Sequence, residues 1–244
     1  MIVIEWITDP AILASLVTLT AMEIVLGIDN IVFISVIVGR LPPDQSKRAR
    51  QIGLALALVF RVIFLLALFW LIGLTEPVFE IFGHGVSWRD IVLFAGGLFL
   101  IAKGTHEIHK DVEGNHEDAA GSARTGASFN AIVAQIILID IVFSVDSIVT
   151  AIGMAEFVSV MIVAVIIAMG VMYVAAGVVS GFIQRHPTTR MLALAFLLMI
   201  GFALVADGAG FHVPRGYLYT AMAFSAVVEF LNVLARRNRA KRPA

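Results

Sequence analysis

The sequence predicts an all-α polytopic membrane protein, with seven transmembrane helices forming a 3+3 inverted repeat plus one further helix. Three observations predict this fold: an apolar composition, seven long apolar runs, and two copies of one acidic motif. Hydrophobic residues make up 60% of the 244 residues and charged residues 14%, against roughly 25% charged in soluble proteins. This composition excludes a soluble globule, a nucleic-acid-binding protein and a disordered chain. The chain has no Cys, so disulfides and thiolate metal sites are also excluded.

A helix needs about 20 mostly apolar residues to cross a bilayer. The runs that meet this requirement are 11–38, 52–73, 91–103 extended to about 109, 130–153, 158–182, 191–205 and 217–235. These runs are continuous rather than alternating, which disfavours an outer-membrane barrel. The acidic Glu5 and the lack of a basic segment before the first run do not fit a cleaved signal peptide.

The distribution of basic residues predicts the orientation. Of the 17 basic residues, 13 fall in the first, third and fifth loops or in the C-terminal tail, whereas the second and sixth loops contain only Arg89 and Arg215. We therefore expect a multi-pass protein of the inner (plasma) membrane, with its N-terminus outside and its C-terminus in the cytoplasm.

The internal repeat is the most informative feature of the chain. Residues 23–32 read EIVLGIDNIV and residues 140–149 read DIVFSVDSIV, which match position for position. The copies lie three crossings apart, and an odd number of crossings reverses the chain direction. We predict a first repeat over 1–109, a cytoplasmic linker over 110–129, a second repeat over 130–207, and a seventh helix with a basic tail over 208–244. Inverted repeats place substrate sites near the bilayer midplane.

The motif residues form the candidate site. An acid at the bilayer centre costs about 2.5–3.5 kcal/mol, so the motif acids should face a polar cavity, a partner or a cation. Carboxylates, Asn and Ser are hard oxygen donors, which suit Mg²⁺, Ca²⁺ or Mn²⁺. Crowded carboxylates also bind protons, so protons compete with the metal. The predicted metal-binding residues are Glu23, Asp29, Asn30, Asp140, Asp146 and Ser147.

Chain direction predicts how the acids pair. If both motif helices are continuous, Glu23 should face Asp146, and Asp29 should face Asp140. Alternatively, Gly27 could break the first helix and bring its carboxylates together.

Arg61 and Glu229 are possible modulators of the site, each about halfway along an apolar run. Arg61 is either a structural salt bridge or a tethered cation that replaces the ion. Glu229 is either a fifth acid of the pathway or a hydrogen-bonded packing residue. The pair Gly96–Gly97 and the GxxxG motif of Gly177 and Gly181 predict close helix packing.

The sequence resembles the TerC family of integral membrane proteins, and within it the short YgdQ-like branch. The resemblance rests on EIVLGIDN at 23–30, DIVFSVDS at 140–147, GGLFLIAK at 96–103 and EIH at 107–109. It implies seven helices and, for some branches of the family, Mn²⁺ efflux. It also implies roles for the four motif acids Glu23, Asp29, Asp140 and Asp146.

The predicted function is therefore the export of divalent cations by proton-coupled alternating access, with Mn²⁺ as the expected substrate. We expect no enzymatic activity, no permanently bound cofactor and no nucleic-acid partner; the expected partners are the metal ion, protons and the lipid bilayer. A non-transporting membrane scaffold or biogenesis factor is the main alternative. An intramembrane aspartyl protease using Asp29 and Asp146, and an exporter of organic cations or amino acids, are further alternatives.

Overall fold

The computed structural model describes residues 9–67, 75–81, 84–113, 128–152 and 157–240. The seven helices of these segments are all long and apolar enough to cross a membrane, which confirms the predicted fold class. Two short strands form an antiparallel hairpin. In chain order the elements are α2 (Pro10–Val38), α3 (Pro43–Leu66), β1 (Pro77–Ile81), β2 (His84–Ser87), α5 (Trp88–Glu113), α6 (Phe129–Ile152), α7 (Val158–Arg185), α8 (Pro187–Gly208) and α9 (Arg215–Ala240).

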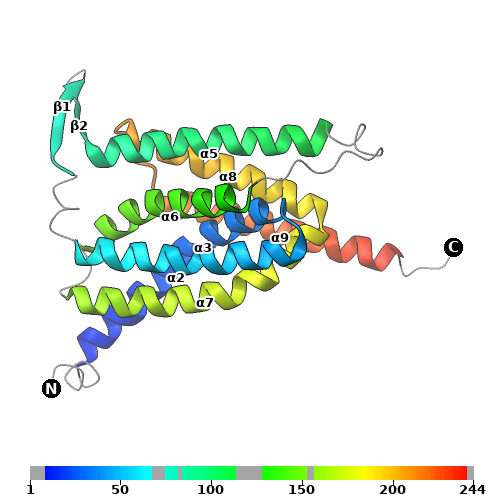
Figure 1. Cartoon of the computed structure of the whole chain (residues 1–244), viewed down its shortest axis with the longest axis horizontal. Coiled ribbons are helices and arrows are strands. Elements are labelled where there is room, and N and C mark those ends of the chain that lie inside the picture. The colour runs from blue at the N-terminus through cyan, green and yellow to red at the C-terminus, as the bar shows by residue number, and fades with distance from the viewer. Residues whose placement is uncertain (1–8, 68–74, 82–83, 114–127, 153–156, 241–244) are drawn as a thin grey trace.

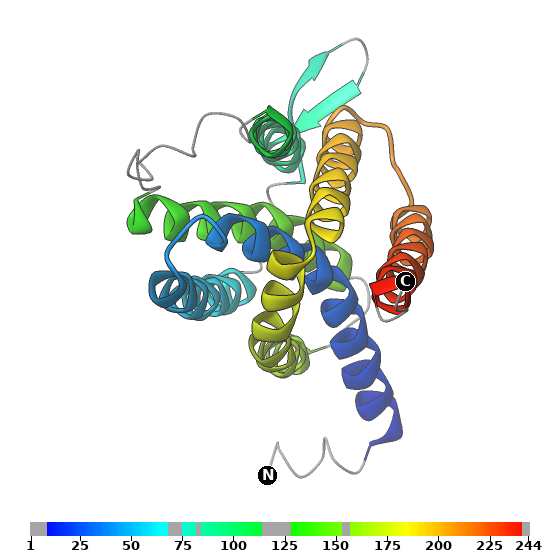
Figure 2. The ribbon, with the colours of Figure 1, turned by 90° about the vertical axis from the view of Figure 1, so that its right-hand side faces the viewer.

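The helices alternate in direction, so the bundle has two ends (Figure 1). We call the end at which α2, α5, α7 and α9 begin the N-face, and the end at which α3, α6 and α8 begin the C-face. Helix α9 lies at the periphery of the bundle (Figure 2), and Tyr217 and Phe224 are more than 70% exposed. This exposure is the expected pattern for a lipid-facing surface.

Local sequence signals explain where the helices begin. Asp9 caps α2 by accepting a hydrogen bond from Ala11 N at 2.8 Å. Proline opens α2, α3 and α8, where its missing N–H costs nothing. Helix α3 begins at Pro43, earlier than the apolar run at 52 indicated, because its first turns are polar and lie outside the run.

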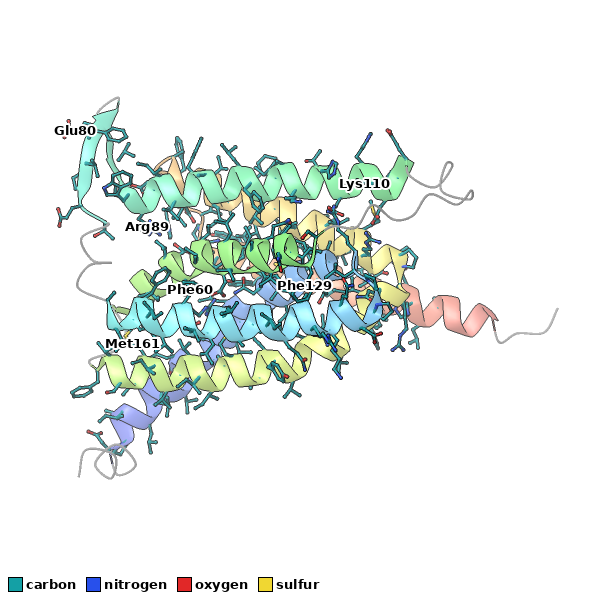
Figure 3. All side chains as sticks on the ribbon, in the orientation of Figure 1. Phe60, Glu80, Arg89, Lys110, Phe129 and Met161 are labelled. Atoms are coloured by element: carbon teal, nitrogen blue, oxygen red, sulfur yellow. The ribbon has the colours of Figure 1, made fainter. Side chains whose placement is uncertain are left out.

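The β1–β2 hairpin was not predicted. It precedes α5 and leads into a capping box, in which Ser87 Oγ accepts from Asp90 N at 3.2 Å and the Asp90 carboxylate accepts from Ser87 N at 2.9 Å. This box sets the start of α5 and fixes the position of Arg89 between its two residues. Figure 3 shows Arg89 at the N-face end of α5 and Lys110 near the other end.

Helices of the two predicted repeats pack against each other. Helix α2 packs on α7, α6 packs on α3, and α5 packs on α8. Each motif helix therefore packs on the second helix of the other repeat, as an inverted repeat requires. The repeat boundaries stay predictions, and most of the predicted 110–129 linker lies outside the described residues.

Glycines permit the closest of these contacts. A Cβ on Gly97 would stand 2.6 Å from the carbonyl oxygen of Gly201, and a Cβ on Gly201 would stand 3.0 Å from that of Gly97. The close helix packing predicted for Gly96–Gly97 is therefore confirmed. The same prediction for Gly177 and Gly181 is wrong, because a Cβ on either would meet only an arginine side chain at 3.5 Å.

Candidate functional site

The two motif helices each present polar residues on two separate faces. Residues spaced by four and seven positions share a helix face, so Glu23, Gly27 and Asn30 lie along one side of α2. Asp29 follows Glu23 by six residues, which correspond to about 240° of rotation around the helix axis, so Asp29 points to a different neighbour. Helix α6 repeats this division: Asp140, Ser144 and Ser147 share one face, and Asp146 lies on another.

Arg61 connects the face of α2 that carries Glu23 to the face of α6 that carries Asp140. Its Nη1 lies 2.7 Å from Glu23 Oε2, and its Nη2 lies 3.1 Å from Asp140 Oδ1. All three side chains are almost fully buried: Arg61 and Glu23 are each 2% exposed, and Asp140 is 5% exposed. Two carboxylates share one guanidinium, so the trio has a formal charge of −1 when both acids are ionised.

Two further polar groups complete this central network. Asn30 Nδ2 donates to Asp140 Oδ1 at 3.4 Å, and Ser144 Oγ donates to Asp140 Oδ2 at 3.4 Å. Ser147 donates to the carbonyl of Ser144 at 3.5 Å and so lies beside the network. We call Glu23, Asn30, Arg61, Asp140 and Ser144 the central network.

Asp146 belongs to a second group, at the N-face. Arg89 Nη2 lies 2.5 Å from Asp146 Oδ1, and Arg215 Nη2 lies 2.7 Å from Asp146 Oδ2. Arg215 Nη2 also lies 3.0 Å from Asp207 Oδ2. We call Arg89, Asp146, Asp207 and Arg215 the N-face cluster; its two arginines and two aspartates balance in charge and connect α5, α6, α8 and α9.

The turn between α8 and α9 positions Arg215. Gly210 has a positive φ of 86°, and Phe211 N donates to Ala206 O at 2.8 Å, which is the Schellman pattern that ends a helix. Asp207 then accepts from Val213 N at 3.0 Å. The returning chain therefore starts α9 with Arg215 beside Asp146 and Asp207.

Asp29 is a third buried motif acid, and one of its carboxylate oxygens has no hydrogen-bond partner among the described residues. The residue is 7% exposed, and the oxygen without a partner is Oδ1. Arg215 and Tyr219 are near enough to interact with it electrostatically. An unsatisfied buried carboxylate oxygen is costly, so Asp29 is the motif acid best placed to take up a proton or a cation.

The C-face has ion pairs of its own. Arg40, in the turn between α2 and α3, pairs with Glu107 of α5, with Nε 2.8 Å from Oε2. Arg190 of α8 pairs with Asp111 of α5 at 2.9 Å. Burial and the neighbouring Arg190 lower the pKa of the Arg40 guanidinium, while Asp111 opposes them.

The structure corrects the predicted pairing of the acids. Glu23 meets Asp140 through Arg61, and Asp146 meets two arginines, so the layers predicted as Glu23 with Asp146 and Asp29 with Asp140 are wrong. The alternative of a break at Gly27 is also wrong, because α2 is continuous. Among the described residues, no three His, Asp or Glu side chains lie close enough to hold one metal ion, so metal binding stays a prediction.

Glu229 lies apart from the central network and accepts from Thr188 Oγ1 at 2.5 Å and Thr189 Oγ1 at 3.1 Å.

The sequence analysis did not predict Arg89 and Arg215 as site residues. The signal was present, because they are the only basic residues of the two loops assigned to the outside.

The described segments form seven helices that enclose acids of the two matched motifs, which defines a polytopic membrane protein with a charged interior. The chain belongs to the integral membrane protein TerC family, which it matches over residues 8–244. No solved structure matches the chain.

Three relatives illustrate the range of the family. A UPF0053 protein of Haemophilus influenzae is 48% identical over 233 residues, covering 96% of this chain and 98% of the relative. The UPF0053 inner membrane protein YgdQ of Escherichia coli is 47% identical over 232 residues, covering 95% and 97%. The UPF0053 inner membrane protein YoaE of Escherichia coli is 47% identical over 234 residues, but the chain spans only 45% of its length. These matches confirm the predicted resemblance.

Proposed function

We propose that the protein exports divalent metal cations across the inner membrane in exchange for protons, by alternating access. The observation that supports this most directly is the central network. Glu23 and Asp140, one from each motif, share the single guanidinium of Arg61, and both acids are buried at the middle of their helices. A site with an uncompensated negative charge in a low-dielectric interior favours a proton or a cation.

Arg61 would act as a tethered counter-ion in this mechanism. Its guanidinium lies between the two carboxylates that a metal ion would need, so the ion and Arg61 would compete for the same oxygens. The donors released by moving Arg61 are carboxylate oxygens and the Asn30 amide, a hard set that suits Mn²⁺, Mg²⁺ or Ca²⁺. We favour Mn²⁺ because the family resemblance points to it.

The ion pairs at the two ends would be the gates. We propose that the N-face lies outside, where the N-face cluster connects four helices and closes the path. The Arg40–Glu107 and Asp111–Arg190 pairs would close the cytoplasmic C-face. Alternating access requires one set of contacts to open while the other stays closed.

The test is flux into liposomes that contain the purified protein. With a proton gradient imposed, we expect Mn²⁺ transport that Asp140→Asn or Asp29→Asn abolishes, whereas the exposed hairpin variant Glu80→Gln transports normally. Proton movement, read by a trapped pH dye, should accompany the metal. The proposal is wrong if Mn²⁺, Ca²⁺ and Mg²⁺ all fail to move, or if both aspartate variants transport normally.

A second candidate function is a non-transporting scaffold. It is favoured by the completeness of the ion pairs: Glu23, Asp140 and Asp146 each bind an arginine, as a purely structural network would. In that case the liposomes show no flux, while Arg61→Gln still reduces stability. The protease alternative has less support, because both Asp146 oxygens bind arginines rather than a shared proton.

A further inference from the structure

A cavity separate from the central network lies between α2, α7, α8 and α9, with a volume of about 500 Å³. Its walls are almost entirely apolar and include the aromatic rings of Phe182, Phe196, Tyr219 and Phe230. This volume lies within the usual range for small-molecule sites, roughly 300–1,000 Å³. None of the central network residues lines it.

One carboxylate is present among the residues that line this cavity, that of Glu229. Thr188 and Thr189 both donate to its Oε1, which fixes its orientation. These threonines form the first turn of α8, so the carboxylate lies toward the C-face. Tyr219, ten residues earlier on α9, is about 15 Å nearer the N-face.

The cavity is therefore polarised along the membrane normal. Its negative group is close to the level at which α7 ends and α8 begins, and its apolar walls extend from there into the bundle. Val25, Ile28 and Val32 supply the α2 wall, on a different face from Glu23 and Asn30. A negative group at one end and a long apolar interior are complementary to an amphiphile with a positive head.

We propose that this cavity binds a single-chain amphiphile with an ammonium head group. The ammonium would pair with the Glu229 carboxylate, and the alkyl chain would extend toward Tyr219. The Phe230 ring also lines the cavity, and aromatic faces attract ammonium groups. An anionic amphiphile of the same length would place its charge against Glu229 and should be rejected. The inference does not depend on metal transport.

The test is equilibrium binding of radiolabelled decyltrimethylammonium to the full chain in lipid nanodiscs. We expect saturable binding of one molecule per chain, competed by unlabelled probe but not by decyl sulfate. Glu229→Gln should reduce affinity at least tenfold, and Glu80→Gln should not change it. Non-saturable partitioning into the lipid, equal competition by decyl sulfate, or full affinity in Glu229→Gln would overturn the proposal.

A second variant keeps the test decisive if Glu229→Gln does not fold. Ala226 lines the cavity, so Ala226→Phe fills it while leaving the carboxylate in place. The larger side chain should abolish saturable binding. Unchanged binding would show that the probe is not in this cavity, which would contradict the proposal.

Discussion

Glu23 and Asp140 bind one guanidinium through different nitrogens: Arg61 Nη1 lies 2.7 Å from Glu23 Oε2, and Nη2 lies 3.1 Å from Asp140 Oδ1. The two acids occupy the same position in the two motif copies. Helix α3 contributes the arginine, and among the described residues of α7, its counterpart in the second repeat, only Arg185 at the C-face end is basic. The pseudo-symmetric acids therefore share an asymmetric partner, and Arg61 is the residue of the central network that connects Glu23 to Asp140.

Removing Arg61 should cost far more stability than removing a surface arginine. Breaking a buried ion pair typically costs about 3–5 kcal/mol, because it leaves an uncompensated charge. We expect this loss in the unfolding free energy of Arg61→Gln, measured by SDS titration of the detergent-solubilised protein. Combining it with Glu23→Gln and Asp140→Asn should restore most of the loss. A loss under about 1 kcal/mol, or no recovery in the combined variant, would contradict a dominant role for this pairing.

Arg61→Lys separates charge from geometry. A lysine keeps the positive charge but cannot offer the planar, multi-donor arrangement that reaches both carboxylates. We expect a stability between those of the wild type and Arg61→Gln in the same titration. If Arg61→Lys matched the wild type, charge alone would account for the network.

The N-face cluster should show pairwise coupling between α6 and α9. Arg215 contacts Asp146 and Asp207, and its side chain is 21% exposed, so each interaction is weaker than those of Arg61. A double-mutant cycle of Arg215→Gln and Asp146→Asn should give a coupling of about 0.5–3 kcal/mol. The pair Arg215→Gln with Glu80→Gln is the control and should be additive.

Much of this organisation could be predicted from the sequence, because hydropathy and chain direction determine spans and repeats. The seven helices of the described segments and the burial of Glu23, Asp29 and Asp140 belong to this part. The depth of the acids in the bilayer did not by itself predict which residues they pair with. Glu23 and Asp29 are at different depths but also on different helix faces, and the face decides which neighbour each one meets.

Other features depend on tertiary packing, which brings together residues that are distant in the sequence. Arg89 and Arg215 reach Asp146 only because a capping box starts α5 and the Gly210 turn starts α9. Likewise, Gly96–Gly97 and the Gly177–Gly181 motif looked equivalent as small-residue patterns. Only the first faces another backbone in the fold.

The α5–α8 contact should be intolerant of a single methyl group. A Cβ at Gly97 would stand 2.6 Å from a backbone oxygen of α8, so Gly97→Ala requires the helices to separate. We expect a clear loss of unfolding free energy. Gly170→Ala in α7 is the matched control, because its Cβ meets no atom within 4 Å and should change stability by no more than about 1 kcal/mol. Equal effects would show that helix propensity, rather than the crossing, decides the outcome.

The proposed orientation can be tested by single-cysteine labelling, since the natural chain has no Cys to remove. His212, in the α8–α9 turn at the N-face, and Gln45, near the start of α3 at the C-face, are both exposed. In intact cells with a permeable outer membrane, a membrane-impermeant maleimide should label His212→Cys but not Gln45→Cys. Disrupting the inner membrane should make Gln45→Cys reactive. The reverse pattern would place the N-face in the cytoplasm, and the N-face cluster would then close the inner side of the pathway.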